Sequence, residues 1–340
     1  MNVTVAASQF AVPFDHSAPN HDRFEVILFS SSEAAARNIA GLPAAARALH
    51  ERVGAGTGCC AIAVPGGWVP DDPVRAELDR LAGGMAYACM DANLFTNSGP
   101  GRVILHTDAL PADAARRIVA ATAKPGDGIV SRHINRPVSQ AISGRLLRWP
   151  GIRPIHATWV TAALALAMVL SLLLGGAAGL ISGAVLFQAA SIVDGVDGEI
   201  ARATFRTSAH GARLDSLVDA ATNVGFVGGV AINLFRAGEV TAALAGGAAG
   251  VLLAAGLALI GQRARASKRP FTFNGVKERV GAGKSRVMTW LTWLTMRDFF
   301  ALAAALLVIA GFAPFTMFAF AVVTAGWFAG VVAVMGHQAA

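Results

Sequence analysis

Residues 194–219 read DGVDGEIARATFRTSAHGARLDSLVD, and this stretch guides the interpretation of the whole chain. Asp194 and Asp197 are three residues apart, which places both on one face of a helix. Asp215 and Asp219 are four apart and share a face in the same way. A short polar turn between the pairs allows the two faces to meet. Because carboxylates are expensive in or near a bilayer, four of them beside apolar sequence indicate a functional site.

The composition of the whole chain predicts an integral membrane protein. Of the 340 residues, 54% are hydrophobic and only 14% are charged, and the mean hydropathy is +0.54. An average soluble domain carries about 25% charged residues. These values exclude a disordered chain, a disulfide-rich secreted scaffold and an ordinary soluble enzyme.

Three runs without any charged side chain locate the expected membrane spans: 157–193, 240–262 and 299–336. A spanning helix needs about 20 residues, so the first and last runs each predict a pair of helices. We expect a multi-pass α-helical membrane protein with six transmembrane helices, near 157–175, 179–204, 211–235, 239–262, 291–311 and 315–336.

The net charge of +7 is concentrated in two segments beside these runs. Residues 132–156 contain five arginines and no acid, and residues 263–290 contain eight basic residues and one acid. Cytoplasmic flanks carry an excess of Lys and Arg, so we expect both segments and both termini on the cytoplasmic side of a bacterial-type inner membrane. A nucleic-acid-binding protein would spread its basic residues over a soluble face, and no nucleic-acid partner is expected.

Residues 132–156 form the expected juxtamembrane segment. Ile134, Val138, Ile142 and Leu146 recur every four residues, which favours an amphipathic helix on the membrane surface. The alternative is a helix packed on a soluble domain. The membrane domain is then expected over 157–340.

Residues 1–131 predict a cytoplasmic α/β domain with a parallel sheet, because strand-like and helix-like segments alternate. The first strand-to-helix turn, Ser30–Glu33, has neither glycine nor lysine, so it lacks a phosphate cradle. We expect strands at 24–31, 59–65 and 103–106, and helices at 36–53, 73–83 and 113–123.

The carboxylates and their neighbours favour a metal site that handles phosphate. Without a partner the acids would repel one another and take up protons. Hard oxygen ligands suit Mg²⁺, Mn²⁺ or Ca²⁺, and phosphate chemistry favours Mg²⁺, with Mn²⁺ as a substitute. Small residues at 198, 201 and 211 leave space beside the backbone, and Arg202 adds a cation suited to phosphate. The alternative is that the acids pair with arginines of the same stretch.

The stretch resembles the signature of the CDP-alcohol phosphotransferases, Asp-x2-Asp-Gly-x2-Ala-Arg-x8-Gly-x3-Asp-x3-Asp. With the six spans and the juxtamembrane helix, the resemblance covers about 132–336. It implies an enzyme that moves a phosphoalcohol group from a CDP-alcohol to a second alcohol, releases CMP and forms a homodimer. It implies metal ligands at Asp194, Asp197, Asp215 and Asp219, with Asp219 also the general base, and nucleotide contacts from Gly198, Ala201, Arg202 and Gly211.

Two segments outside the signature carry further comparisons. Family members often have Pro-Asn-x-x-Thr before the first span, whereas residues 154–158 read PIHAT, with Ile155 in the place of Asn. The sequences at 38–56 and 126–139 more weakly resemble the sugar-phosphate nucleotidyltransferase domain fused to such enzymes in inositol-phosphate pathways, as in relatives of phosphatidylinositol-phosphate and di-inositol-phosphate-phosphate synthases. The glycine-rich loop of that domain is missing, so we expect a degenerate domain without cytidylyltransferase activity. The alternative is an unrelated α/β cap.

The signature names the reaction and leaves the two alcohols open. A site at the membrane favours CDP-diacylglycerol as donor, and basic residues favour an anionic acceptor, either inositol phosphate or glycerol 3-phosphate. A transferase that uses a soluble donor such as CDP-inositol is the alternative enzyme. A membrane scaffold with an inactive site is the non-enzyme alternative, and it predicts the loss of at least one aspartate. The basic residues are Arg213, Lys277, Arg279, Lys284 and Arg286.

Overall fold

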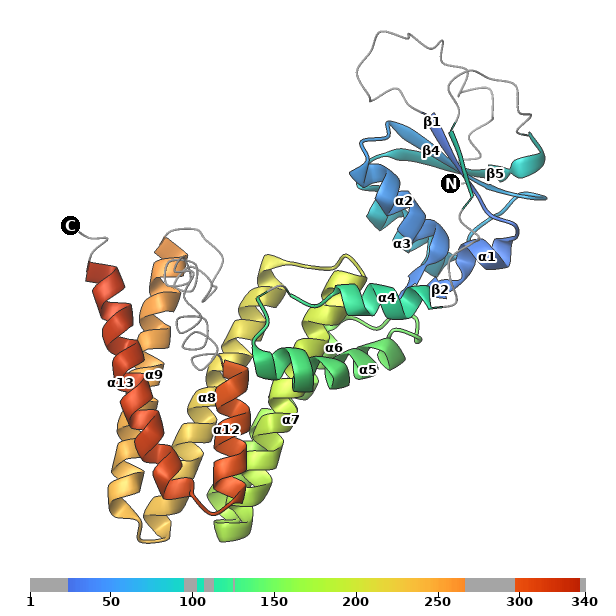
Figure 1. The fold of residues 1–340 in the computed structure, drawn as a ribbon. Helices are drawn as coiled ribbons and strands as arrows, with labels where there is room; N and C mark the ends of the chain where they lie inside the picture. The colour runs from blue at the N-terminus through green and yellow to red at the C-terminus, as the bar shows by residue number, and fades with distance from the viewer. Residues whose placement is uncertain (1–23, 95–102, 107–112, 125, 267–296, 337–340) are drawn as a thin grey trace. The chain divides into compact units, whose positions relative to one another are not determined.

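The computed structural model describes residues 24–94, 103–106, 113–124, 126–266 and 297–336. The chain divides into two compact units, Met1–Arg116 and Arg117–Ala340, drawn in Figure 1. This division falls before the boundary expected after residue 131. The assignment of 1–131, 132–156 and 157–340 to three functional parts stays a prediction.

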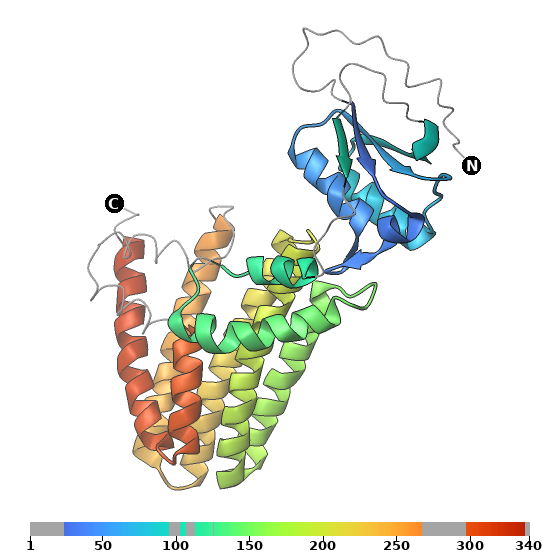
Figure 2. The ribbon, with the colours of Figure 1, turned by 45° about the vertical axis from the view of Figure 1, so that its right-hand side comes forward.

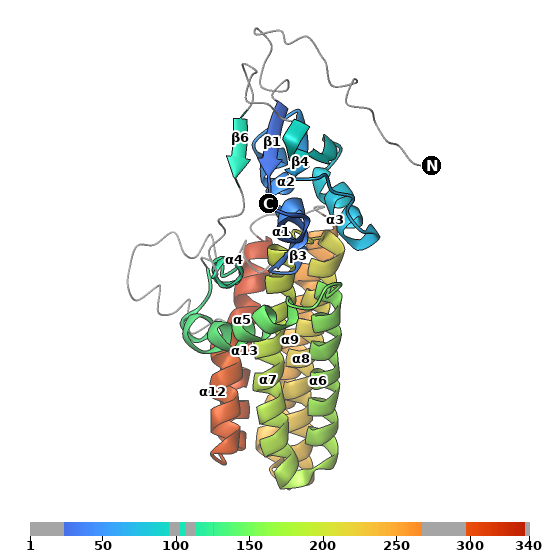
Figure 3. The same ribbon diagram turned by 90° about the vertical axis from the view of Figure 1, so that its right-hand side faces the viewer.

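The first unit contains a parallel four-stranded sheet, as expected for an α/β domain. Its strand order is β5-β4-β1-β6, and each neighbouring pair is parallel. Figure 3 shows β6 on the opposite side of β1 from β4. Buried residues of β1 and β4 such as Val26 and Ala61 form part of the core. The strands are β1 (Phe24–Leu28), β4 (Cys59–Val64), β5 (Ala86–Asp91) and β6 (Val103–His106).

Local signals fix the ends of α3 (Asp72–Ala82), which agrees with the helix expected over 73–83. Asp71 precedes it, and its Oδ1 accepts a hydrogen bond from Val74 N at 3.3 Å. Such a cap satisfies one of the free N–H groups of the first turn. Gly83 follows the helix with φ of +57°, a left-handed conformation that glycine adopts without steric cost.

The single helix expected over 36–53 is wrong in its first part. A hairpin interrupts it, because Ala40 and Gly41 both have positive φ and this backbone cannot continue a helix. Arg47 holds the hairpin by donating from Nη2 to Ile39 O at 2.9 Å. In order, the segment contains α1 (Ser32–Ala36), β2 (Asn38–Ile39), β3 (Leu42–Pro43) and α2 (Ala44–Gly54). The last helix expected in this region is α4 (Ala114–Ala121).

The second unit is a helical bundle. Five of its helices are long and apolar enough to cross a membrane. The described part of α12 has 13 residues, about 20 Å at 1.5 Å per residue, which is shorter than a bilayer core of ~30 Å. The count of six spans therefore stays a prediction, and residues 291–296 and the basic loop before them lie outside the described residues. The long helices are α6 (Pro154–Leu174), α7 (Gly176–Ala203), α8 (Ala209–Arg236), α9 (Val240–Ala266) and α13 (Ala313–Gly336), with α12 (Arg297–Ile309) beside them.

Small residues allow the bundle helices to approach closely. A Cβ on Gly183 would lie 2.5 Å from side-chain atoms of Leu172, and a Cβ on Gly229 would lie 2.8 Å from the same side chain. Close backbone approach at small residues is typical of membrane helices. Phe187 of α7 and Phe226 of α8 stack in the core with ring centroids 4.0 Å apart. This packing joins the middle parts of α7 and α8.

Helix α5 (Arg136–Leu146) runs across the bundle and contacts α7 (Figure 2). A π-helical turn over Ser131–Asn135 precedes it. Ile134 in this turn and Val138 in α5 are apolar and are 42% and 45% exposed. The buried stripe is polar instead and includes Ser139. An outward apolar stripe is what a membrane-surface helix requires, and its placement on the membrane surface stays a prediction.

Candidate metal centre and catalytic site

A tight turn joins the two aspartate-bearing helices. Helix α7 ends at Ala203. Phe205 follows with φ of +52°, and Arg206 N donates back to Ala201 O at 2.8 Å. Ser208 then caps α8, because its Oγ accepts a hydrogen bond from Gly211 N at 3.0 Å. Two of the expected nucleotide-site residues, Ala201 and Gly211, therefore help to build this turn. The turn brings the last turns of α7 beside the first turns of α8.

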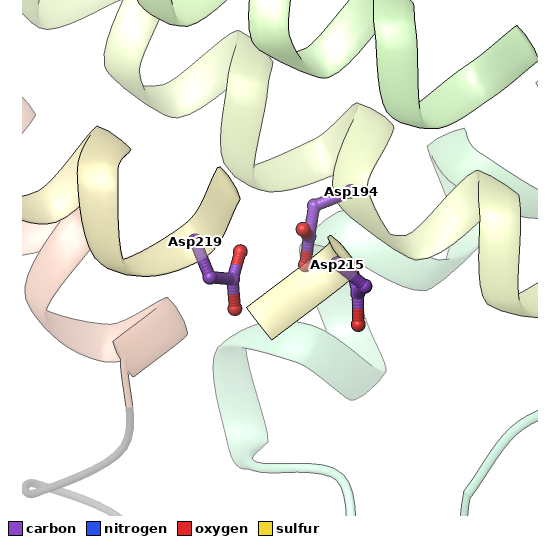
Figure 4. A group of neighbouring side chains, drawn as sticks. All are labelled: Asp194, Asp215 and Asp219. Carbon is purple, nitrogen blue, oxygen red and sulfur yellow. The ribbon is translucent and has the colours of Figure 1, made fainter. Parts of the chain in front are cut away.

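Three carboxylates meet across this junction. Asp194 on α7 and Asp215 and Asp219 on α8 each offer an oxygen, and these oxygens all lie within 4.8 Å of one another. Figure 4 shows the three side chains together, and all three are half-buried. Carboxylates this close repel one another, and an oxygen-only set of ligands fits a hard divalent cation. The residues present therefore fit a metal ion.

Asp197 is held differently from the other three acids. It is buried, and its Oδ2 accepts a hydrogen bond from Thr158 Oγ1 at 2.7 Å. Thr158 is the threonine of the PIHAT sequence and lies in the first turns of α6. Asp197 is not one of the three acids whose oxygens meet, and its assignment as a fourth metal ligand stays a prediction.

Gly198 and Arg202 form one local unit on α7. Arg202 Nε donates to Thr122 O at 2.8 Å. A Cβ on Gly198 would lie 2.9 Å from Arg202 Nη1, so glycine is what allows the guanidinium to lie against the helix backbone. The space at Gly198 that was expected for the nucleotide is thus partly filled by Arg202. Nucleotide contacts from these residues stay a prediction.

Comparison with known families decides the class of protein. The family model for CDP-alcohol phosphatidyltransferase matches residues 154–335, which is more than half of the chain. The chain belongs to the CDP-alcohol phosphatidyltransferase family. Its long apolar helices support an integral membrane protein, and the family implies a CDP-alcohol donor and an alcohol acceptor.

Curated relatives match a shorter part of the chain. Three of them are each named bifunctional IPC transferase and DIPP synthase. The protein of Thermococcus kodakarensis is 42% identical over 111 residues, that of Aquifex aeolicus 37% over 115, and that of Rubrobacter xylanophilus 40% over 124. These stretches cover 31%, 32% and 36% of this chain and 23%, 24% and 27% of the relatives. The chain therefore matches about a quarter of the length of each relative.

Sequence reasoning missed an ionic network that joins α5 to α7. Arg136 of α5 pairs with Asp127 through Nε–Oδ2 and Nη2–Oδ1 contacts of 2.7 and 3.1 Å. Its Nη1 donates to Glu199 Oε1 at 2.8 Å. Burial alone would raise the pKa of Asp127, but the hydrogen bonds and charge of Arg136 outweigh burial and lower that pKa below its usual value. Glu199 occupies a position that the family signature leaves unspecified, so the signature gave no signal for it.

The lowered pKa of Asp127 gives a prediction about acid stability. A carboxyl with a lower pKa in the folded state stabilises the fold above its unfolded pKa of about 3.9, and this stabilisation is lost as the pH falls through the folded pKa. We expect Asp127→Asn to lower the melting temperature at neutral pH, and its difference from the wild type to shrink below about pH 4. Thermal unfolding of both proteins in detergent across this range measures the difference. A difference that grows in acid contradicts the assignment.

Proposed function

We propose that this transferase moves a phosphatidyl group from CDP-diacylglycerol to an inositol phosphate and releases CMP, with Mg²⁺ at the carboxylate cluster. The observation that carries the proposal is the meeting of Asp194, Asp215 and Asp219 within 4.8 Å. Mn²⁺ can replace Mg²⁺ in such an oxygen site. Asp197, three residues after Asp194 on α7, is the fourth proposed ligand.

The proposed reaction is a direct displacement at phosphorus. Asp219 takes the proton from the acceptor hydroxyl, the hydroxyl oxygen forms a bond to the phosphorus that carries the donor alcohol, and the bond from that phosphorus to CMP breaks. A positioned carboxylate base suits this proton transfer. A bound divalent cation neutralises charge that develops on the leaving CMP. Gly198, Ala201, Arg202 and Gly211 are proposed to contact the nucleotide.

The position of the cluster supports a lipid donor. Asp194 lies in a helix long and apolar enough to cross a membrane, and Asp215 and Asp219 lie in another. A donor whose acyl chains lie in the bilayer can therefore present its diphosphate at the level of the carboxylates. A lipid donor fits this placement without leaving the membrane.

A second candidate is a transferase that uses a soluble donor such as CDP-inositol. The names of the curated relatives, which include DIPP synthase, favour this candidate. The inositol-phosphate character of those names also supports inositol phosphate over glycerol 3-phosphate as the acceptor in the first candidate. The intact aspartates weigh against an inactive membrane scaffold.

A panel of donors and acceptors tests the proposal. Purified protein is incubated with Mg²⁺, one of the donors CDP-diacylglycerol and CDP-inositol, and one of the acceptors inositol 1-phosphate and glycerol 3-phosphate. We expect CMP release to be fastest with CDP-diacylglycerol and inositol 1-phosphate. Faster release from CDP-inositol would select the second candidate, and no CMP from any pair would overturn the function.

The proposal also places the catalytic end of the bundle in the cytoplasm. Exposed cysteines report this orientation: Ser32→Cys in the first unit and Glu239→Cys in the turn between α8 and α9, at the opposite end of α8 from the cluster. Burial raises the pKa of Cys60 to about 12 and that of Cys89 to about 11, so these native thiols react slowly.

In intact cells, a maleimide that cannot cross the membrane is expected to label Glu239→Cys but not Ser32→Cys. Permeabilised cells serve as the control, because both sites become accessible there. Labelling of Ser32→Cys before permeabilisation contradicts the orientation.

For the first unit, we propose a domain without cytidylyltransferase activity. The turn after β1 offers Ser31, whose Oγ accepts a hydrogen bond from Ala34 N at 3.1 Å, and a serine-rich turn without glycine or lysine supports a domain without cytidylyltransferase activity. CTP consumption by the full chain with inositol phosphate would refute this.

The family resemblance also leads us to propose a homodimer. Light scattering of the protein in detergent tests this oligomeric state.

A further inference from the structure

Helices α5 and α7 meet along two facing stripes of small and polar residues. Each stripe repeats every four residues, which keeps it on one face of its helix. Asn135 Nδ2 lies 3.4 Å from Ser191 Oγ at one end, and Ser143 Oγ lies 2.6 Å from Glu199 Oε2 at the other. The stripe of α5 and the turn before it is Asn135, Ser139 and Ser143, and the stripe of α7 is Ser191, Gly195 and Glu199.

Gly195 lies where side chains of α5 pack closely against α7. A Cβ at this position would lie 3.1 Å from Arg136 Nη1 and 3.3 Å from Ser139 Oγ. A methyl group at this position would therefore require the Arg136 and Ser139 side chains to shift by a few tenths of an ångström. One turn further along α7, Glu199 lies on the same face and is within reach of the same donors.

Glu199 is fully buried and is held by three donors from α5. Its Oε1 accepts hydrogen bonds from Ser139 Oγ at 2.7 Å and from Arg136 Nη1 at 2.8 Å, and its Oε2 accepts from Ser143 Oγ at 2.6 Å. A buried carboxylate is stable only when it is paired and hydrogen-bonded. Donors to both oxygens therefore fix the carboxylate, and with it the rotation of α7 about its own axis.

The clamped face of α7 lies behind the face that carries the aspartates. At about 100° per residue, Glu199 lies about 160° around the helix from Asp197 and about 140° from Asp194. A rotation of α7 that followed loss of the clamp would therefore move both aspartates. A turn of 20° displaces a carboxylate oxygen by about 2 Å at ~6 Å from the axis, which exceeds the tolerance of metal–ligand distances, about 0.2 Å.

We propose that Glu199, with Ser139, Ser143 and Arg136, is a positioning clamp that sets the rotation of α7 and so the geometry of the metal centre. The inference rests on the proposed role of the aspartates in binding metal. Glu199 does not touch the metal or the substrate in this account. It acts through Asp194 and Asp197, on the opposite face of the same helix.

The test separates positioning from ordinary stabilisation by measuring metal affinity directly. Mn²⁺ binding to the purified full chain is followed by electron paramagnetic resonance of the free ion, alongside Mg²⁺-dependent CMP release and the melting temperature. The test variant is Glu199→Ala. Glu199→Gln is the conservative variant, because its amide keeps the shape and can hydrogen-bond the same serines. Gln188→Ala is the matched control: it removes the 2.9 Å bond from Gln188 Nε2 to Asn135 Oδ1 at the far end of the same interface.

We expect Glu199→Ala to weaken Mn²⁺ binding by about 10–100-fold, the usual cost of losing a group that orients metal ligands, and to lower turnover by a similar factor. Glu199→Gln is expected to stay within about threefold of the wild type, since its hydrogen bonds survive. Gln188→Ala is expected to bind Mn²⁺ like the wild type, whatever its melting temperature. If Glu199→Ala does not fold, the double variant Ser139→Ala/Ser143→Ala, which keeps the ion pair with Arg136, is expected to weaken Mn²⁺ binding about tenfold.

Wild-type Mn²⁺ affinity in Glu199→Ala, or in the double serine variant if the first does not fold, overturns the clamp. Equal losses in Glu199→Ala and Gln188→Ala also overturn it, because the effect would then be general to the interface. Equal losses in Glu199→Gln and Glu199→Ala overturn it too, since charge rather than geometry would be responsible. Failure of the proposed function looks different: the wild type itself would then bind no Mn²⁺ and release no CMP.

Discussion

Asp219→Asn is expected to lower the turnover of CMP release by about 10²–10⁴-fold, the usual contribution of a positioned general base. Asparagine keeps the shape and one oxygen ligand, so Mg²⁺ and the CDP-alcohol should still bind, although more weakly. It cannot accept the proton of the acceptor hydroxyl. High Mg²⁺ should therefore not restore the rate. Asp219 lies on α8, and one of its carboxylate oxygens is within 4.8 Å of an oxygen of Asp194 and of an oxygen of Asp215.

The measurement is the Mg²⁺ dependence of CMP release at saturating substrates. Glu239→Gln, which removes a carboxylate at the other end of α8, is the control and is expected to behave like the wild type. Wild-type turnover in Asp219→Asn would eliminate the base assignment. Full recovery at high Mg²⁺ would also contradict it, because the residue would then act only as a ligand.

Asp194→Asn and Asp215→Asn are expected to differ from Asp219→Asn in kind. Each removes a charge from the cluster, so the affinity for Mg²⁺ should fall. Loss of a residue that only orients a metal ligand lowers metal affinity by about 10–100-fold, and loss of a ligand charge should lower it at least as much. High Mg²⁺ should restore part of the activity, because the proton acceptor is still present. Direct Mn²⁺ binding and the Mg²⁺ concentration at half-maximal CMP release measure the change.

Asp197→Asn provides an informative comparison for these two variants. The carboxylate of Asp197 accepts a hydrogen bond from Thr158, and asparagine can keep that bond through its oxygen. A loss of metal affinity as large as in Asp194→Asn would support the fourth ligand. Parallel losses of affinity with no separate effect on turnover, at every one of the four positions, would contradict the distinct role given to Asp219.

The spacing of the aspartates predicts most of the site, because it follows from helix geometry alone. Three and four residues separate the members of each pair, and the structure does bring Asp194 together with Asp215 and Asp219. Spacing does not predict how each side chain is oriented within the shared face. That Asp197 accepts a hydrogen bond from Thr158 depends on how α6 packs against α7, and no local pattern reports such packing.

The interface between α5 and α7 shows a second limit of sequence patterns. The apolar repeat that begins at Ile134 is easy to see, and it predicts the helix. The residues that α5 buries are the serines between the apolar positions, and a buried polar stripe resembles a solvated one in sequence. Glu199 was missed for the same reason, because a charged residue is expected at a surface unless its partners are known.

The remaining comparisons concern the first unit and the fifth expected span. The helix expected over 36–53 was wrong in its first part, because propensity favours Ala-rich sequence as helix, whereas Gly41 and Pro43 allow a hairpin that Arg47 then holds. The parallel sheet was predictable, since alternating strands and helices permit few other arrangements. The extent of the fifth span depends on residues beyond those that the structure describes.

The central claim is that the carboxylate cluster holds a divalent cation without which this transferase does not release CMP. Metal removal tests it most directly: CMP release from CDP-diacylglycerol and from CDP-inositol is measured in the presence of inositol 1-phosphate before EDTA treatment, after it, and after Mg²⁺ is added back. The account predicts that EDTA abolishes release and that Mg²⁺ restores it in the wild type, whereas Asp215→Asn needs a much higher Mg²⁺ concentration. CMP release that continues unchanged in EDTA would contradict the account.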